Sequence, residues 1–535
     1  MNYTNESLDR IQKIKKLKDA GLIVYANKFD KKYDISEILK NKDKIKDASY
    51  LMKDGASGDF KTAGRIISFH SHGKLAFAKI QDNTGFIQIC FVKDKIKLND
   101  GQNFLDSIDI QGEKKIAYKI IEKFIDVGDY LGIEGDLFFT KHGELTIFVD
   151  NFQILSKAIR PLPEKWHGIK DKELSYRQRY LDLISNEETY NRFLLRSKFL
   201  KVLRDFYHEN NFIEIETPVL GSAASGAAAK PFVTYHNDFD HDFFLRISPE
   251  TNLKKSTVGR FEKVFEIARD FRNEGSDPSH LQEFTMVEHY AVYWNFENNM
   301  DFTEKMFNYL FDNIPELKKQ IKVKNKNGEI KEIDFSNKWE KIDYIDGVKN
   351  SCGIDVTKYN LGDEKKLISD IKGVGVEFVG MDKMAVPTLI DYLYKKVLRP
   401  NIVGPAFVYN YPKTMQPLAR QSDKNSNIVE QFQLVVNGWE IVKAYSELVD
   451  PEIQKANFDS QKEAIKQGDE EATSGDDDFV LAMEYAMPPQ SGFGMGIERI
   501  LTILSEQENL RDIVLFPLMK PLKNDIDIDQ ENELI

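Results

Sequence analysis

Two stretches with β-strand character, 263–274 and 283–293, follow each other with a short polar segment between them. This pattern predicts an antiparallel hairpin, and side chains on a strand alternate between its two faces. Arg272 and Glu274 therefore share one face of the first strand. His280 lies in the predicted loop. The return strand places four alternate residues on one face: Phe284, Met286, Glu288 and Tyr290.

If both sets face one cavity, the hairpin presents a cation, carboxylates, an aromatic ring and a phenol together. A guanidinium binds phosphate oxygens through paired, charge-assisted hydrogen bonds. A ring stacks on adenine, and a carboxylate pairs with an ammonium group. The pattern therefore favours a nucleotide and an amino acid held side by side. The alternative is a hairpin with a surface ladder of salt bridges.

Glycine alternates near the end of the chain, at Gly492, Gly494 and Gly496, and Arg499 follows. Alternate glycines let a ligand approach the backbone closely. A helix that starts there would offer its N-terminus to phosphate. The spacing differs from the G-x-G-x-x-G of a dinucleotide-binding loop, and no P-loop signature occurs.

Asn437-Gly438 between two apolar runs predicts a hairpin with a type I′ turn. On its second strand Lys443, Tyr445 and Glu447 have the same parity, whereas Glu440 has the other. All four reach one site only if a β-bulge intervenes. The alternative is an amphipathic edge hairpin.

The N-terminal part has a different character. Residues 59–155 alternate in short runs separated by turn signals, which predicts a small β-barrel or sandwich. A five-stranded oligonucleotide-binding barrel fits that size. A helix is expected over 7–18, either solvated on its polar face or in contact with RNA. The proline-marked segment 160–163 predicts a linker. After it, an apolar stripe within 195–206 predicts a helix packed on a core, and mixed elements continue as a large α+β domain.

Composition limits the function classes. The net charge is −12, so an RNA contact requires a local basic patch on an acidic body. Cys90 and Cys352 lack the clustered spacing of a zinc site or a disulfide framework. No signal peptide is evident and no apolar run is long enough to span a bilayer, so the expected location is cytoplasmic, without membrane contact.

At this point the motifs resemble a known family. FRNEGSDPSHLQEFTMVEHY, FIEIETPVL and GFGMGIERI resemble motifs 2, 1 and 3 of class II aminoacyl-tRNA synthetases. YRQRYLDLI, GAAAKPF, YSELVDPEIQ and RDIVLFPLMKP are similar to the bacterial-type lysyl-tRNA synthetases, as are TAGRIISFHSHGKLAFAKIQD and KHGELTIF in the predicted barrel. The resemblance runs with gaps from about residue 8 to Pro521 and is weakest over 305–405.

The resemblance implies an α+β fold: an N-terminal five-stranded OB-fold β-barrel and a class II catalytic domain built on an antiparallel sheet with flanking helices. The expected organisation is an N-terminal helical extension (1–55), an anticodon-binding barrel (56–157), a linker (158–175), the catalytic domain (176–521) and an acidic tail (522–535). Within the catalytic domain the motifs are expected at about 205–220, 263–293 and 491–505.

The implied activity is ATP-dependent activation of L-lysine to lysyl-adenylate and transfer to tRNA(Lys), with Mg²⁺ as cofactor, in a homodimer formed through motif 1. By resemblance, ATP is bound by Arg272, Glu274, His280, Phe284 and Arg499, of which Arg272 and Arg499 are catalytic. The amino acid is bound by Gly226, Glu250, Glu288, Tyr290, Tyr445 and Glu447. Magnesium is assigned to Glu440, and an anticodon base to Phe77, with Gln88 and Glu144 beside it.

Two departures from the family pattern fall in the site. Gln433 stands where a second magnesium-binding glutamate is expected, and Lys443 where an asparagine usually contacts the amino acid. An amide oxygen can meet magnesium but adds no charge. The alternatives are an aspartyl or asparaginyl synthetase, an enzyme that attaches an amino acid to a protein, and a synthetase-derived RNA-binding or signalling protein. Glu447 suits an ammonium group and argues against the first of these.

Overall fold

The structure is a computed structural model that describes residues 3–163, 169, 171–223, 225–227, 229–275, 277–325, 327–466 and 475–522. The chain forms two compact units, one spanning Met1–Lys170 and the other Asp171–Lys520. The predicted acidic tail, 522–535, lies outside the described residues apart from its first residue. In the predicted linker, residues 164–168 and 170 also lie outside them, and helix α5 (Lys172–Arg177) occupies its last part.

The first unit contains the predicted five-stranded barrel. Its strands are β1 (Phe60–His72), β2 (Leu75–Gln81), β3 (Phe86–Val92), β8 (Tyr130–Phe139) and β9 (Leu145–Ser156). They pair in the closed order β1-β2-β3-β9-β8-β1, with β3 parallel to β9 and the other pairs antiparallel. Closure leaves no free strand edge in the ring. The OB-fold expectation is confirmed.

Short elements complete this unit. They are helices α1 (Asn5–Asp19), α2 (Ile35–Lys40), α3 (Ala48–Asp54) and α4 (Ala117–Phe124), and strands β4 (Lys97–Asn99), β5 (Phe104–Leu105), β6 (Ser107–Ile110) and β7 (Glu113–Ile116). Helix α1 corresponds to the helix expected over 7–18. It buries Ile14 and Leu17 in the barrel core, and Arg10 Nη1 donates to Val127 O over 3.0 Å.

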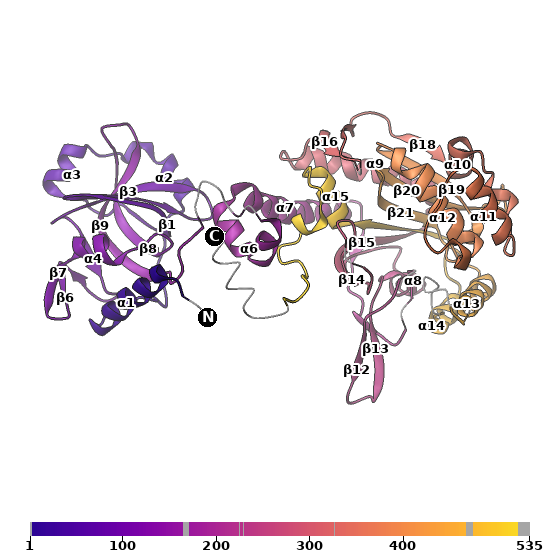
Figure 1. The fold of residues 1–535 in the computed structure, drawn as a ribbon, viewed down its shortest axis with the longest axis horizontal. Coiled ribbons are helices and arrows are strands. Elements are labelled where there is room, and N and C mark those ends of the chain that lie inside the picture. The colour runs from indigo at the N-terminus through magenta and orange to yellow at the C-terminus, as the bar shows by residue number, and fades with distance from the viewer. Residues whose placement is uncertain are drawn as a thin grey trace. The chain divides into compact units, whose positions relative to one another are not determined.

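An eight-stranded sheet forms the centre of the second unit (Figure 1). In spatial order it contains β10 (Ile213–Glu214), β14 (Lys263–Phe271), β15 (Glu283–Val292), β22 (Gln490–Gly496), β21 (Trp439–Ser446), β20 (Ile428–Val436), β19 (Ala406–Pro412) and β18 (Glu340–Asp343). The pairs β10–β14 and β18–β19 at the two edges are parallel, and every pair between them is antiparallel.

The first strand of the predicted hairpin is shorter than expected, since β14 ends at Phe271 rather than at residue 274. Arg272 N still donates to Gln282 O of the return segment over 2.8 Å, but Asn273 N donates to Lys230 O over 2.7 Å. The backbone therefore turns to another partner directly after Arg272, which leaves Arg272 at the end of the strand.

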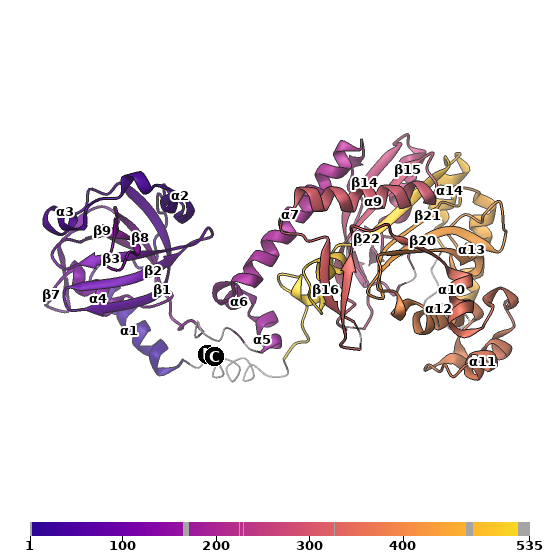
Figure 2. The ribbon, with the colours of Figure 1, turned by 90° about the horizontal axis from the view of Figure 1, so that it is seen from above.

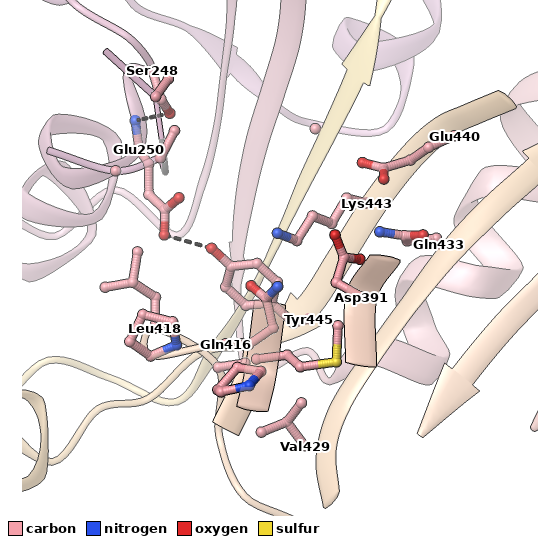
Figure 3. Close-up of a pocket in the computed structure, with 18 of the residues that line it drawn as sticks. Ser248, Glu250, Asp391, Gln416, Leu418, Val429, Gln433, Glu440, Lys443 and Tyr445 are labelled. Carbon is pink, nitrogen blue, oxygen red and sulfur yellow. Dashed lines mark hydrogen bonds between the residues drawn. The ribbon is translucent and has the colours of Figure 1, made fainter. Parts of the chain in front are cut away.

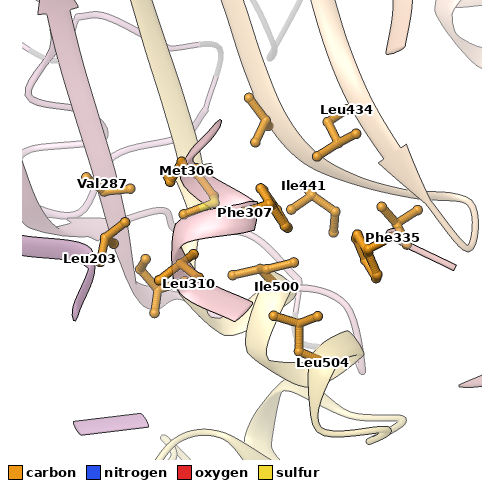
Figure 4. Close-up of a cluster of buried hydrophobic side chains, with 14 of the residues drawn as sticks. Leu203, Val287, Met306, Phe307, Leu310, Phe335, Leu434, Ile441, Ile500 and Leu504 are labelled. Carbon is orange, nitrogen blue, oxygen red and sulfur yellow. The ribbon is translucent and has the colours of Figure 1, made fainter. Parts of the chain in front are cut away.

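One face of this sheet is covered by helices α7 (Glu187–Glu209), α9 (Phe296–Asn313) and α15 (Ile497–Leu504), with α7 packed against α9 (Figure 2). Figure 4 shows the resulting core, in which Leu203, Val287, Met306 and Leu434 meet. The predicted apolar stripe of α7 is confirmed: Phe199, Val202, Leu203 and Phe206 are buried in this cluster.

The remaining helices of this unit are α6 (Arg179–Ser185), α8 (Glu250–Val258), α10 (Tyr344–Cys352), α11 (Glu364–Gly373), α12 (Val386–Val397), α13 (Pro451–Lys466) and α14 (Asp477–Glu484). The remaining strands are β11 (Leu220–Gly221), β12 (Val233–His236), β13 (His241–Leu245), β16 (Gln320–Lys324) and β17 (Ile330–Asp334). No described helix is both long and apolar enough to cross a bilayer.

The segment with alternate glycines is a strand followed by a helix. β22 ends at Gly496 and α15 begins at Ile497. The buried Glu498 fixes the start of this helix, because its Oε2 accepts from Thr285 N of β15 over 2.9 Å and its Oε1 accepts from Arg196 Nη2 of α7 over 2.7 Å. Glu498 thus acts as a structural anchor beside Arg499.

Candidate functional site

A cavity of about 1720 Å³ opens on the face of the eight-stranded sheet opposite the helix-packed core. The parity of the strands explains this position. Val287 and Phe493 are buried against the helices, while their neighbours Glu288 and Gly494 line the cavity. Each central strand therefore contributes alternate residues to the core and to the cavity.

The two sets of hairpin residues face this one cavity, as predicted. It is lined by Arg272, Glu274, His280, Phe284, Met286, Glu288 and Tyr290. The guanidinium of Arg272 lies 5.1 Å from the centroid of the Phe284 ring, and its Nε and Nη2 each lie 3.4 Å from Ile247 O. A planar cation beside an aromatic ring, at the end of a strand, suits the binding of a nucleotide. The arrangement therefore favours this interpretation of the hairpin over the alternative, a surface ladder of salt bridges.

Further cations line the same cavity. Arg499 lines it and donates from Nη1 to Glu440 O over 3.2 Å. Arg399, in the short 3₁₀ helix Arg399–Asn401, and Lys395 of α12 also line it. His280 is about half-exposed, and its Nδ1 lies 2.8 Å from Asp277 Oδ2 in the same loop.

The predicted β-bulge is present in the hairpin of β20 and β21. Leu434 pairs with Val442 and Val435 pairs with Glu440, so Ile441 is the extra residue. Asn437 and Gly438 have φ of 50° and 70°, as a type I′ turn requires. The bulge turns residues of both parities towards one space. Figure 3 shows three side chains from this strand around the cavity: Glu440, Lys443 and Tyr445.

Glu447, the fourth residue of that prediction, stands behind the cavity wall. Its side chain is fully buried, and Lys254 of α8 forms an ion pair with its Oε2. Lys254 Nζ also donates to Glu250 Oε1 over 2.6 Å, and Tyr445 Oη donates to the same oxygen over 2.6 Å. A resident lysine therefore lies behind the acidic wall of the cavity, paired with two of the carboxylates expected to bind the amino acid.

Burial and charge oppose each other in this cluster. Burial raises the pKa of Glu447 to about 8, while the ammonium of Lys254 acts in the opposite direction. Burial alone lowers the pKa of Lys254, but the charges of Glu250 and Glu447 outweigh it, so the net shift is upward. Lys254 thus remains charged, and it favours the ionised form of Glu447.

A third carboxylate belongs to the same wall. Ser248 Oγ donates to Glu288 Oε1 over 2.8 Å, and Tyr290 Oη lies 3.3 Å from Glu288 Oε2. Burial, together with neighbouring carboxylates, raises the pKa of Glu288 well above its usual value. A cationic ligand would relieve this concentration of acidic groups.

At this end of the cavity, two positions require glycine because neighbouring side chains lie too close to leave room for a Cβ atom. A Cβ on Gly492 would lie 2.2 Å from Glu447 Oε1 and 2.4 Å from Tyr290 Cε1. Gly226 has φ of 90°, and a Cβ there would lie 3.0 Å from that of Glu250. A side chain at either position would displace the acidic groups.

The oxygen atoms near Arg499 fit a magnesium ion whose remaining ligands would come from a bound nucleotide. Glu440 supplies a carboxylate, and Gln433 has a buried Oε1 with no hydrogen-bond partner in the described part of the chain. Lys443 lies directly opposite Gln433 in the strand register. Mg²⁺ is commonly held by one or two protein oxygens together with substrate phosphates, which agrees with this sparse set.

On the barrel, the three predicted anticodon residues lie near one another. Gln88 Nε2 donates to Thr146 Oγ1 over 2.9 Å, and Lys79 Nζ lies 2.9 Å from Glu144 Oε1. Lys79 is also the register partner of Gln88. Phe77 is half-buried on the outer face of β2, against a small cluster outside the barrel core. Strand β2 buries Ala76, Ala78 and Ile80 instead, so Phe77 is not part of the barrel core.

Among the residues of the cavity region that were not predicted from the sequence are Ser248, Lys254, Lys395 and Arg399. The only available signal for Lys254 was its i,i+4 spacing from Glu250, which places both on one side of a helix. Arg399 lies in the stretch where the resemblance to the family is weakest.

Comparisons with known proteins agree with this architecture. Residues 171–520 match the family model of class II tRNA synthetases (D, K and N), and residues 60–155 match that of the OB-fold nucleic acid binding domain. A lysine–tRNA ligase of Aquifex aeolicus (strain VF5) is 43% identical over 463 residues, which cover 86% of this chain and 73% of that protein. The lysine–tRNA ligase of Aliarcobacter butzleri (strain RM4018) is 39% identical over 526 residues, 98% of each chain.

The packing of Gly492 predicts a position-specific effect. Gly492→Ala should lower the stability of the second unit by about 1–3 kcal/mol, because the new methyl group overlaps Glu447 and Tyr290. Thermal unfolding measures this. Gly494→Ala, two residues along the same strand and with no contact closer than 3.4 Å, is the control and should change stability by less than about 0.5 kcal/mol. Equal effects of the two substitutions would contradict the packing argument.

Proposed function

Because the chain belongs to the family of class II tRNA synthetases for aspartate, lysine and asparagine, we propose that it activates L-lysine with ATP and transfers the lysyl group to the 3′ end of tRNA(Lys). The observation that carries the choice of lysine is the acidic end of the cavity, where Glu250 and Glu288 line the wall and Glu447 lies behind it. An ammonium side chain is stabilised there, whereas the carboxylate of aspartate would be repelled.

The proposed reaction has two steps. An oxygen of the lysine carboxylate attacks the α-phosphorus of ATP, and the bond to the β-phosphate oxygen breaks, which gives lysyl-adenylate and pyrophosphate. A hydroxyl of the terminal ribose of tRNA then attacks the carbonyl carbon, and AMP leaves. The first nucleophile is already ionised, so that step requires positioning and charge stabilisation rather than a general base.

The cavity residues divide this work. Arg272, at the end of β14, is proposed to hold the α-phosphate and the lysine carboxylate together. Phe284 and Glu274 hold adenine by stacking and hydrogen bonding. His280 and Arg499 contact the outer phosphates. For the amino acid we propose the α-ammonium at Gly226 and Glu250 and the side-chain ammonium at Tyr290 and Glu447, with Glu288 and Tyr445 in the same wall.

Magnesium would reduce the repulsion between phosphates and the attacking carboxylate. We propose that Glu440 holds this ion together with the nucleotide, and that the amide of Gln433 contributes an uncharged oxygen. The ammonium of Lys443, opposite Gln433, adds a fixed positive charge to the same region.

The barrel is proposed to bind the anticodon through Phe77, Gln88 and Glu144, as residues 60–155 match a nucleic-acid-binding domain. Lys79 lies between these groups and supplies a local positive charge on an otherwise acidic chain. A tRNA-charging enzyme acts where tRNA is held, so the cytoplasm is its proposed location.

We further propose that the enzyme is a homodimer. In the single chain, Ile213, Val219 and Leu220 of the motif 1 region are about 40–50% exposed, and Val233, Tyr235 and Phe239 of the neighbouring hairpin are more exposed still. Exposed apolar groups that gather in this way mark surfaces that another protein covers.

Amino-acid-dependent ATP–pyrophosphate exchange tests the activity. Exchange should require lysine, and Arg272→Ala should slow it by about 10²–10³-fold, because a preorganised charge at the phosphate is lost. Lys198→Ala is the control, since Lys198 lies on the surface of α7 and pairs with Glu316, and neither residue lines the cavity. Exchange with aspartate or asparagine and none with lysine would contradict the substrate, and an unchanged rate in Arg272→Ala would contradict the mechanism.

Binding of tRNA tests the barrel. Phe77→Ala should weaken the affinity for tRNA(Lys) by about 1–3 kcal/mol through the loss of one stacked base. It should leave lysine-dependent exchange without tRNA unchanged. Phe104→Ala removes another exposed ring of the same unit, on β5, and should have no effect. Equal affinities for the two variants would exclude Phe77 as the stacking residue.

Sedimentation equilibrium at micromolar concentration tests the dimer. The expected mass is that of two chains. Leu220→Asp should shift the population towards single chains, because it places a charge in the proposed apolar contact. Ile330→Asp, an exposed apolar residue of β17, is the matched control. A single-chain mass for the unsubstituted protein would rule the dimer out.

A further inference from the structure

The buried ammonium of Lys254 has no role in the two-step reaction described above. Only 1% of its side chain is exposed. It forms ion pairs with two carboxylates. Glu250 lies one helical turn earlier on α8, and Glu447 lies far away in the sequence, directly after β21. Both carboxylates are those proposed to receive the two ammonium groups of lysine.

The bonds of Lys254 use one oxygen of each carboxylate. On Glu250 it is Oε1, which also accepts from Tyr445. Oε2 of Glu250 has no partner in the described part of the chain, and this residue lines the cavity. On Glu447 the bond is to Oε2. Oε1 of Glu447 is buried against Gly492, itself a cavity residue, and the backbone N–H of Gly492 lowers the pKa of Glu447.

Aromatic rings fix the ammonium in this position. The centroids of the Tyr290, Tyr445 and Phe479 rings lie 5.8, 5.6 and 5.6 Å from Lys254 Nζ. Ring faces attract a cation and exclude water from it. The cation is therefore rigid and dry, and its electrostatic effect on the two carboxylates is stronger than that of a solvated lysine.

We propose that Lys254 is a positioning residue for the amino-acid substrate: it holds Glu250 and Glu447 by their inner oxygens, so that the outer oxygen of each is directed at one ammonium group of lysine. The inference rests on the proposed function. Without this cation the pKa of Glu447 would rise further, and a protonated carboxyl group binds an ammonium group poorly. Lysine would then have to displace that proton on binding.

The pH dependence of lysine binding follows from the groups around Lys254. These are Glu250 of α8, Glu447, Tyr445 of β21 and Tyr290 of β15, with Glu288 farther along β15. An acid with a raised pKa is ionised only at higher pH. The KM for lysine should therefore fall as pH rises through the titration of Glu447, and the fall should occur at higher pH when the cation is removed.

The test compares Lys254→Met with Lys255→Met in ATP–pyrophosphate exchange. Lys255 is the next residue of α8 and pairs with Asp478 over 2.5 Å, away from the carboxylates. In Lys254→Met the KM for lysine at neutral pH should rise about tenfold or more, the cost of an unbalanced buried charge. The pH range over which the KM for lysine falls should move to more alkaline values. The KM for ATP should change by less than about twofold. Lys255→Met should match the unsubstituted enzyme.

Two results would overturn the inference: a pH profile for Lys254→Met that coincides with that of Lys255→Met, or a uniform loss that affects ATP and lysine equally. If Lys254→Met does not fold, as thermal unfolding would reveal, Lys254→Arg decides. This variant keeps the charge and should keep the pH position of the unsubstituted enzyme, and a displaced profile would refute the proposal. Failure of the unsubstituted enzyme to use lysine would refute the proposed function instead, so the two failures are distinguishable.

Discussion

The antiparallel pairing of β14, β15, β22, β21 and β20 is the constraint on which the rest of the second unit depends. A two-residue period forces each strand to divide its side chains between a core of helices and an open cavity. Val287 and Glu288 illustrate this division, since one packs against α7 and the other lines the cavity. The stability of the core and the geometry of the cavity are therefore set by the same register.

That dependence explains why so much could be predicted from the sequence. Parity alone placed Arg272, Phe284 and Tyr290 on one wall, and the mismatch between Glu440 and Lys443 required the β-bulge that is present. The barrel also followed from its alternation and turn signals. These predictions succeeded because they concern local geometry, which neighbouring residues determine.

Contacts between distant elements were not predictable in this way. The strand pattern gave Glu447 the parity of a cavity residue. However, Lys254 extends from helix α8 and covers one of its oxygens. Similarly, the strand ended at Phe271 because Asn273 pairs with Lys230, a contact that no periodicity encodes. Local patterns give the direction of a side chain, whereas its partner depends on tertiary packing.

The acidic cluster represents a balance between stability and recognition. Buried carboxylates are costly, and replacing a buried ion pair by apolar residues often stabilises a protein. Glu250, Glu288 and Glu447 nevertheless gather around one cation and several hydroxyl groups. Such a site keeps its hydrogen-bonding groups directed before the ligand arrives, so less reorganisation is needed on binding.

The bulge at Ile441 has a consequence for how this strand can evolve. Because a single inserted residue resets the parity, the strand before it and the strand after it behave as two separately aligned segments. Deletion of Ile441 would join Glu440 directly to Val442, and ordinary alternation would then keep Glu440, Lys443 and Tyr445 on the cavity side. A one-residue deletion elsewhere in the strand would instead turn the residues beyond it to the opposite face. The bulge is thus the one place in this strand where a codon can be lost without changing which side chains line the wall.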